Sequence, residues 1–109
     1  LKIHFQNSSP EPHSLHFHGT HDPGQDGWEP VVAFGNRDYE IQAGPVGIHP
    51  YHCHVPPLNQ HISKGLFGAF IVDPIIARAP AQEFVLIFSR WDINSTERLY
   101  TWNGIAGLY

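Results

Sequence analysis

The stretch Tyr51-His52-Cys53-His54 is the most informative part of this 109-residue chain. It places the only cysteine of the chain between two histidines, and a further histidine, His61, follows eight residues after the cysteine. A thiolate with several imidazoles nearby is a set of soft ligands that suits copper or zinc. The segment therefore predicts a transition-metal site.

A second group of histidines lies upstream, in His13-Ser14-Leu15-His16-Phe17-His18. Its last five residues are typical of a short strand. The side chains of a strand alternate between its two faces, so His16 and His18 share one face. These two imidazoles form a second pair of candidate ligands.

The strand that contains the cysteine has two chemically different faces. We expect this strand over residues 48–54, with His52 and His54 on one side and Cys53 on the other. One strand then offers a thiolate in one direction and two imidazoles in the opposite direction. It can serve two metal sites at once.

The two faces predict two sets of ligands. On the cysteine side, His13, Cys53 and His61 would match the trigonal His₂Cys arrangement of blue copper. On the other side lies an all-imidazole patch suited to copper or zinc, formed by His16, His18, His52 and His54. Closed structural zinc sites usually take more thiolates than one cysteine supplies, so copper is favoured. The remaining histidines are interpreted as strand, turn or surface residues: His4, His21 and His49.

The composition places these motifs in an all-β chain. Ten glycines and ten prolines separate short strand-like runs, and no helix or internal repeat is expected. The formal net charge of −4, without a Lys/Arg cluster, argues against binding to nucleic acid. No apolar run is long enough to span a bilayer.

The strand pattern suggests a division of the chain. Strands are expected over residues 1–7, 14–18, 39–43, 48–54, 66–72 and 83–89, and a loop over 56–64. Residues 75–82 have the Pro and Ala content of a linker. We therefore expect one domain over residues 1–74, a linker over 75–82, and over 83–109 the beginning of a second domain that the chain does not complete.

The two histidine motifs, followed by Gly65-Leu66-Phe67-Gly68-Ala69-Phe70-Ile71-Val72, resemble the copper motifs of multicopper oxidases. The similarity extends over about residues 1–74 and is greatest to two-domain, laccase-like members. It implies a cupredoxin-like fold, a Greek-key β-sandwich or barrel of two packed sheets. By the same resemblance, the first strands of this domain are expected to precede Leu1.

The resemblance also implies how copper is divided among the ligands. His13, Cys53 and His61 would hold a type 1 copper. The other four histidines would contribute to a trinuclear cluster: His16 to the type 2 copper, and His18, His52 and His54 to the type 3 pair. The family uses eight histidines for that cluster, so the missing half is expected from a second domain on a neighbouring subunit of a homotrimer.

An oxidase of this kind would take electrons one at a time from a reducing substrate at the type 1 copper and reduce dioxygen to water at the cluster. Relatives of this kind are periplasmic or extracellular. Asp26, in Asp26-Gly27, resembles an Asp-Gly found in many oxidases, and its carboxylate is a candidate proton relay. A solvated turn aspartate is the alternative interpretation of Asp26.

Two other functions remain open at this point. Copper nitrite reductases share the fold and the type 1 site, but they carry an aspartate in place of His16 and lack the second histidine of His52-Cys53-His54. A blue-copper electron carrier with one copper has no use for a second histidine face. The histidines of this chain therefore favour dioxygen as the electron acceptor.

Leu66 predicts a raised redox potential. It stands five residues after His61, where many relatives carry an axial methionine, and the chain contains no methionine. Leucine cannot coordinate, and the loss of a weak axial donor destabilises Cu(II) relative to Cu(I). Leu66→Met should therefore lower the type 1 potential without abolishing the site. A redox titration of the variant beside the parent measures this, and an unchanged or higher potential would place Leu66 away from the axial position.

Overall fold

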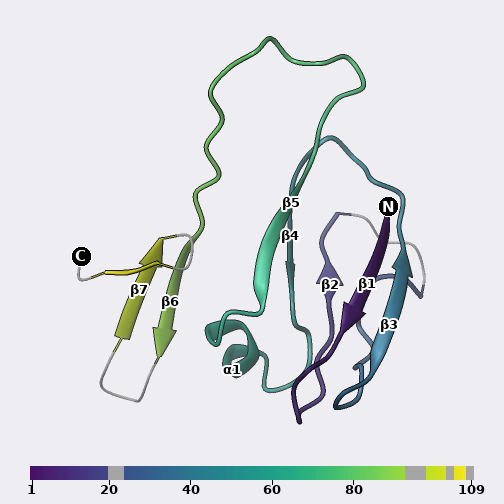
Figure 1. Cartoon of the computed structure of the whole chain (residues 1–109), viewed down its shortest axis with the longest axis vertical. Helices are drawn as coiled ribbons and strands as arrows, with labels where there is room; N and C mark the ends of the chain where they lie inside the picture. Colours follow the sequence, from purple (N-terminus) through teal and green to yellow (C-terminus); the bar gives the residue numbers. More distant parts are fainter. Residues whose placement is uncertain (20–23, 93–97, 103–104, 108–109) are drawn as a thin grey trace.

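The described part of the chain folds into short strands and one short helix. The structure is a computed structural model that describes residues 1–19, 24–92, 98–102 and 105–107. In chain order the elements are β1 (Lys2–Gln6), β2 (His16–Phe17), β3 (Asn36–Glu40), β4 (Gly47–His52), α1 (Leu58–Ser63), β5 (Phe67–Val72), β6 (Phe88–Asp92), β7 (Arg98–Trp102) and β8 (Ile105–Gly107) (Figure 1). The predicted all-β class is confirmed.

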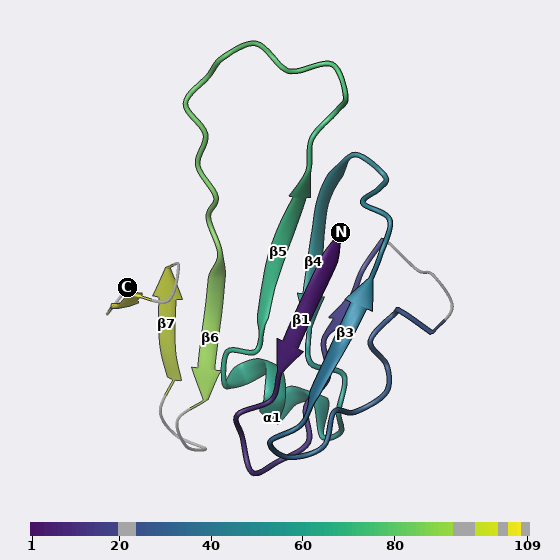
Figure 2. The ribbon, with the colours of Figure 1, turned by 45° about the vertical axis from the view of Figure 1, so that its right-hand side comes forward.

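Two antiparallel sheets make up the first part of the chain. β1 pairs with β3 along its whole length, from Lys2 opposite Glu40 to Gln6 opposite Asn36. β4 is the central strand of the second sheet, with β2 on one side and β5 on the other. Figure 2 shows β1 and β3 in front of β4 and β5. The arrangement is that of two packed layers.

The core fills the space between these layers. Its buried centre consists of Leu15, Phe17, Tyr39 and Ile41. The ring of Phe17 meets the ring of Tyr39 edge-on, with the centroids 5.5 Å apart, a favourable geometry for two aromatic rings. Because side chains alternate along a strand, the inward Phe17 directs its neighbour His16 away from this centre.

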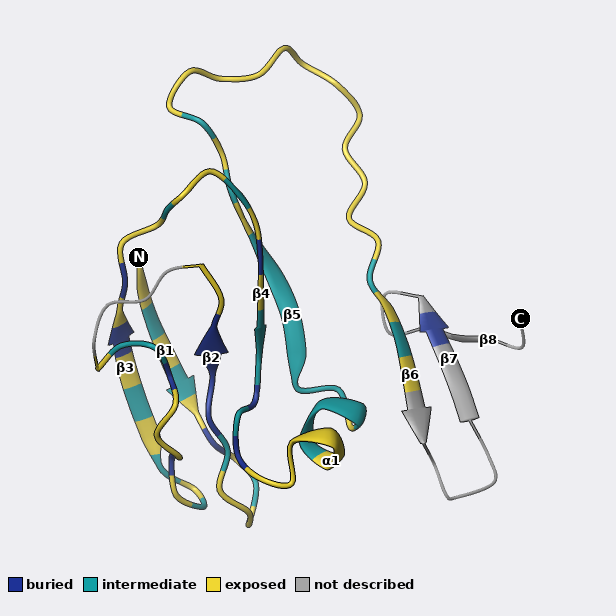
Figure 3. Cartoon of the chain, turned by 180° about the vertical axis from the view of Figure 1, so that it is seen from behind, coloured by how far each residue is buried: buried dark blue, intermediate teal, exposed yellow. Residues whose placement is uncertain are grey.

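A third sheet lies beyond an exposed segment. β6, β7 and β8 pair antiparallel with one another. Residues 73–87, which lead to this sheet, are mostly exposed (Figure 3). Among the residues that the structure describes, no helix has the length and apolar character needed to cross a membrane.

The helix α1 corrects the expected loop over residues 56–64. It contains six residues, too few for a helical period to show in the sequence. Its end is nonetheless marked, because Gly65 has φ 102° and donates its N–H to Ile62 O at 2.9 Å. Glycine adopts such a left-handed conformation at helix ends without steric cost. The prediction that the chain has no helix was wrong.

Strand boundaries also differ from the expected ones. β3 starts three residues before the expected strand over 39–43, because its register with β1 begins at Asn36. β6 starts at Phe88, although the apolar run from Glu83 predicted a strand, because its pairing with β7 begins only at Phe88. β7 and β8 lie in a tail for which the sequence predicted no particular strands.

A substitution at Gly27 tests how tightly the loop before β3 packs against Leu15, which directly precedes β2. It has φ 72°, and an added Cβ would overlap the carbonyl oxygen of Leu15. Gly24 has a similar φ of 83°, but no described atom lies within 4 Å of an added Cβ. We expect Gly24→Ala to cost about 1–2 kcal/mol of unfolding free energy, the strain of a left-handed residue, and Gly27→Ala clearly more. Urea unfolding of both variants measures this, and equal losses would contradict the packing described.

Candidate metal centre

The first cluster brings together three side chains from separate parts of the chain. His13 precedes β2, Cys53 follows β4, and His61 lies on α1. The Sγ atom of Cys53, which is fully buried, lies 3.7 Å from His13 Nδ1. His13 Nδ1 in turn lies 2.9 Å from His61 Nδ1. One ligand atom of each residue is within 4.8 Å of the others, so the thiol and two imidazoles converge as the sequence predicted.

Backbone hydrogen bonds hold the cysteine in place. The N–H of Ser14 donates to Cys53 Sγ at 3.4 Å. The N–H of Cys53 donates to Leu66 O at 3.0 Å, which ties the residue to the beginning of β5. Ser14 is fully buried, and its Oγ accepts the N–H of His54 at 2.8 Å. Ser14 therefore hydrogen-bonds to both Cys53 and His54, whose side chains are predicted to lie on opposite faces.

His13 has its own support. It forms an isolated antiparallel bridge with Val31, in which its N–H donates to Val31 O at 3.1 Å and its carbonyl accepts the Val31 N–H at 2.7 Å. Val31 is buried. This bridge fixes the backbone of His13 ahead of β2, and the His13 side chain faces the cysteine.

The second cluster consists of imidazoles across β2 and β4. His16 stands opposite His52 in the antiparallel pair, and His18 Nε2 lies 2.8 Å from His52 Nε2. These three side chains each offer a ligand atom within 4.8 Å of the others. The ring of His54 adjoins them, with its centroid 5.3 Å from that of His16. His52 and His54 thus lie on one side of the chain and Cys53 on the other.

Two carbonyl oxygens determine which ring nitrogens are available to a metal. His16 Nδ1 lies 2.6 Å from Asp26 O, and His52 Nδ1 lies 2.9 Å from Cys53 O. A carbonyl oxygen only accepts hydrogen bonds, so each Nδ1 must carry a hydrogen, and in the neutral ring Nε2 keeps its lone pair. Metal-binding histidines usually donate their other ring N–H in this way. Both rings are thus oriented for ligation through Nε2.

Burial favours the neutral form of two of the imidazoles. Burial lowers the pKa of His13 below its ordinary value, and the neighbouring His61 lowers it further. Burial also lowers the pKa of His16, and it outweighs the opposing effect of the hydrogen bond to the Asp26 carbonyl. The neutral ring is the form that binds a metal.

The donor set fits copper. The first cluster combines one buried thiol with two imidazoles, a soft set of the blue-copper type. The second cluster consists of imidazoles, which also suit copper. With a single cysteine in the chain, neither cluster matches the multiple thiolates usual in a closed structural zinc site.

The other sequence candidates occupy simpler positions. The carboxylate of Asp26 accepts the N–H of Trp28 at 3.3 Å and so stabilises the turn, while its role as a proton relay stays a prediction. His4 pairs with Asp38 on the exposed surface of the β1–β3 sheet, and His49 is buried within β4. His21 lies outside the described residues.

Sequence reasoning missed the part played by Trp28. Its ring centroid lies 3.8 Å from that of His54 and 5.2 Å from that of His16, so the indole flanks the imidazole cluster. The side chain is nevertheless 51% exposed. The sequence carried no signal for this contact, because it depends on the folded turn at Asp26-Gly27, where the Asp26 carbonyl lies 2.6 Å from His16 Nδ1.

Comparisons with known proteins agree with this chemistry. The family model described as multicopper oxidase matches residues 1–75. A solved multicopper oxidase is 39% identical, with a TM-score of 0.87 over 96% of this chain and 40% of that one. The blue copper oxidase of Nitrosomonas europaea is 26% identical, with a TM-score of 0.77 over 94% of this chain and 40% of that one. These likenesses confirm the expected cupredoxin-like fold.

A curated relative carries a different name. The copper-containing nitrite reductase of Neisseria meningitidis serogroup A is 31% identical over 77 residues, which cover 68% of this chain and 20% of that protein. The chain therefore spans about a fifth of the length of this relative and 40% of the solved oxidases.

Ser14 provides a test of the connection between the clusters. Ser14→Ala removes the acceptor of the His54 N–H and leaves that donor without its partner. We expect a loss of about 1–3 kcal/mol in unfolding free energy. Ser63→Ala is a matched control, because its hydroxyl bonds only the exposed Gln60 carbonyl, and it should change stability by less than about 0.5 kcal/mol. Equal stability of the two variants would show that the Ser14 hydroxyl does not hold His54.

Proposed function

Because the chain belongs to the multicopper oxidase family, we propose that it supplies the type 1 copper domain of a two-domain, laccase-like oxidase. The observation that carries this proposal is the position of Cys53 between two clusters. Its Sγ lies in the thiolate cluster, and its carbonyl oxygen accepts the Nδ1–H of His52, a member of the imidazole cluster. One residue therefore connects both groups of ligands.

The ligands are assigned by cluster. In this proposal His13, Cys53 and His61 would hold the type 1 copper, and Leu66 would supply no ligand. The imidazole cluster contributes to the type 2 and type 3 coppers through His16, His18, His52 and His54. Copper, when bound, supplies one-electron chemistry that couples oxidation of a reducing substrate to the reduction of dioxygen to water.

Residues of the chain provide the route between the clusters. Cys53 is bonded directly to His52 and His54, so the two groups of ligands are joined through very few covalent bonds. The hydrogen bond of 2.9 Å from His52 Nδ1 to the Cys53 carbonyl adds a second link. Cys53 itself is fully buried.

The imidazole cluster is proposed to be half of a shared site. His18 is exposed, and so is about half of the Trp28 side chain beside His54. A second cupredoxin domain of a neighbouring subunit in a homotrimer would cover this surface and supply the remaining histidines. Residues 83–109 are proposed to begin such a domain, after the first domain over 1–74 and a linker over 75–82. A periplasmic or extracellular location goes with this proposal.

A copper nitrite reductase is the second candidate. The 31% identity to the Neisseria protein favours it. Against it stand His16 and His54, whose rings lie 5.3 Å apart in the imidazole cluster and which suit dioxygen reduction. Consumption of nitrite under anaerobic conditions, faster than that of dioxygen in air, would favour the reductase. A blue-copper carrier would need no second cluster at all.

The experiment that tests the proposal separates the subunits of the copper-loaded protein. Dioxygen consumption should vanish on dissociation, because the half-cluster of one chain leaves copper coordination incomplete. The intense visible absorption of the thiolate copper should persist, because His13, Cys53 and His61 lie within one chain. Absorption and oxygen-electrode measurements on the same samples follow both properties.

Cys53→Ser is the control for the absorption. It should remove the visible band, since that band requires the copper–thiolate bond. A band that survives this substitution would remove the type 1 assignment. Full dioxygen turnover by a monomeric preparation would overturn the shared cluster.

A further inference from the structure

The helix α1 separates two cavities. Gln60, His61 and Lys64 line a cavity that also contains His13. The residues on the other side of the helix turn toward β6 and line a larger cavity of about 760 Å³: Leu58, Asn59, Ile62 and Ser63. This division follows the helical period, because residues four apart share a face. The larger cavity therefore lies across the helix from the thiolate cluster.

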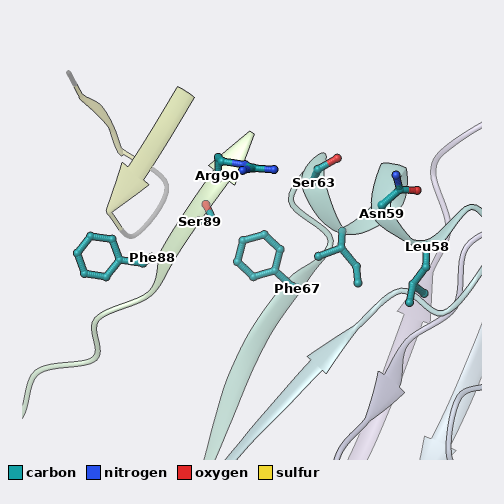
Figure 4. Close-up of a pocket in the computed structure, with 8 residues that line it drawn as sticks. Leu58, Asn59, Ser63, Phe67, Phe88, Ser89 and Arg90 are labelled. Atoms are coloured by element: carbon teal, nitrogen blue, oxygen red, sulfur yellow. The ribbon is translucent and has the colours of Figure 1, made fainter. Parts of the chain in front are cut away.

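The wall of the larger cavity is mostly apolar. Leu58, Ile62, Phe67 and Phe88 contribute hydrocarbon surface. Figure 4 shows the ring of Phe67 between β6 and the helix, with the guanidinium of Arg90 extending from β6 toward Ser63. A hydrogen bond of 2.6 Å between Ser89 and Thr101 ties β6 to β7, which holds this wall in place. The volume is in the range of small-molecule sites.

The charge of the side chains that line the larger cavity indicates the class of ligand that it can bind. Arg90 is the one charged side chain among the eight residues that line the cavity, and no carboxylate is among them. A guanidinium has five N–H donors in a planar fork that matches a carboxylate, so it can bind one while it keeps another partner. The amide of Asn59 adds N–H donors to the lining, and the hydroxyls of Ser63 and Ser89 make it more polar without adding charge.

We propose that this cavity binds a small aromatic carboxylate, with the carboxylate on Arg90 and the ring against Ile62 and Phe67. The inference goes beyond the proposed function and does not depend on copper. It places a ligand against the helix that carries His61, on the face opposite that histidine.

Benzoate is the probe that tests the site, because it is not a reductant. Calorimetric titration of the full copper-loaded protein should give saturable binding at about millimolar concentration or below. Arg90→Gln should weaken benzoate binding about ten- to a hundredfold, the usual loss for a hydrogen bond to a charged group. Arg90→Lys should lose less, because it retains the charge without the fork.

Three controls make the result specific. Arg78→Gln, which removes an exposed arginine paired with Asp73 outside the cavity, should leave binding unchanged. Benzyl alcohol should bind more weakly than benzoate and equally to the parent and Arg90→Gln. Acetate should bind more weakly than benzoate because it cannot fill the apolar wall.

The outcomes distinguish this site from the copper chemistry. Benzoate binding that persists after copper removal and is lost in Arg90→Gln supports the cavity, even if the protein consumes no dioxygen. Binding that disappears with copper and survives Arg90→Gln would place the carboxylate on the metal and overturn the proposal. Equal affinity for acetate and benzoate, tighter binding of benzylamine, or no binding of benzoate would overturn it as well.

Discussion

The alternation of side chains over His52, the last residue of β4, and the next two residues is the constraint on which both clusters depend. His52 and His54 point toward β2, and Cys53 between them points toward His13 and α1. The segments around β2 and the helix α1 then place each of the other candidate histidines on the side of its own cluster.

Packing and hydrogen bonding accomplish this at both clusters. Phe17 is anchored in the core by Tyr39, so the strand β2 cannot turn its histidines inward. Carbonyl oxygens then fix the ring orientation of His16 and His52, and burial favours the neutral form of His16. These hydrogen bonds orient the candidate ligands, which is the usual role of the groups around a metal.

The sequence predicted the structure correctly where the two-residue alternation of an extended chain decides which way a side chain points. The alternation in His52-Cys53-His54 predicted the separation of the two clusters, and the family model confirms the resemblance to multicopper oxidases. It did not predict features that depend on pairing with a distant strand or on a single turn of the chain. The start of β3 depends on β1, and α1 is too short for its period to be visible. The place of Trp28 beside His54 required the folded turn at Asp26-Gly27.

The central claim is tested most directly by measuring the copper content per chain and the visible absorption of two variants, one for each cluster. His13→Ala removes a ligand of the thiolate cluster, and His18→Ala removes one of the imidazole cluster. The account predicts that His13→Ala loses the thiolate absorption but keeps the imidazole-bound copper in the assembled protein. It predicts the reverse for His18→Ala, with reduced copper content and an unchanged visible band. Loss of both properties in both variants would show that the strand end serves one inseparable site, which would contradict the account.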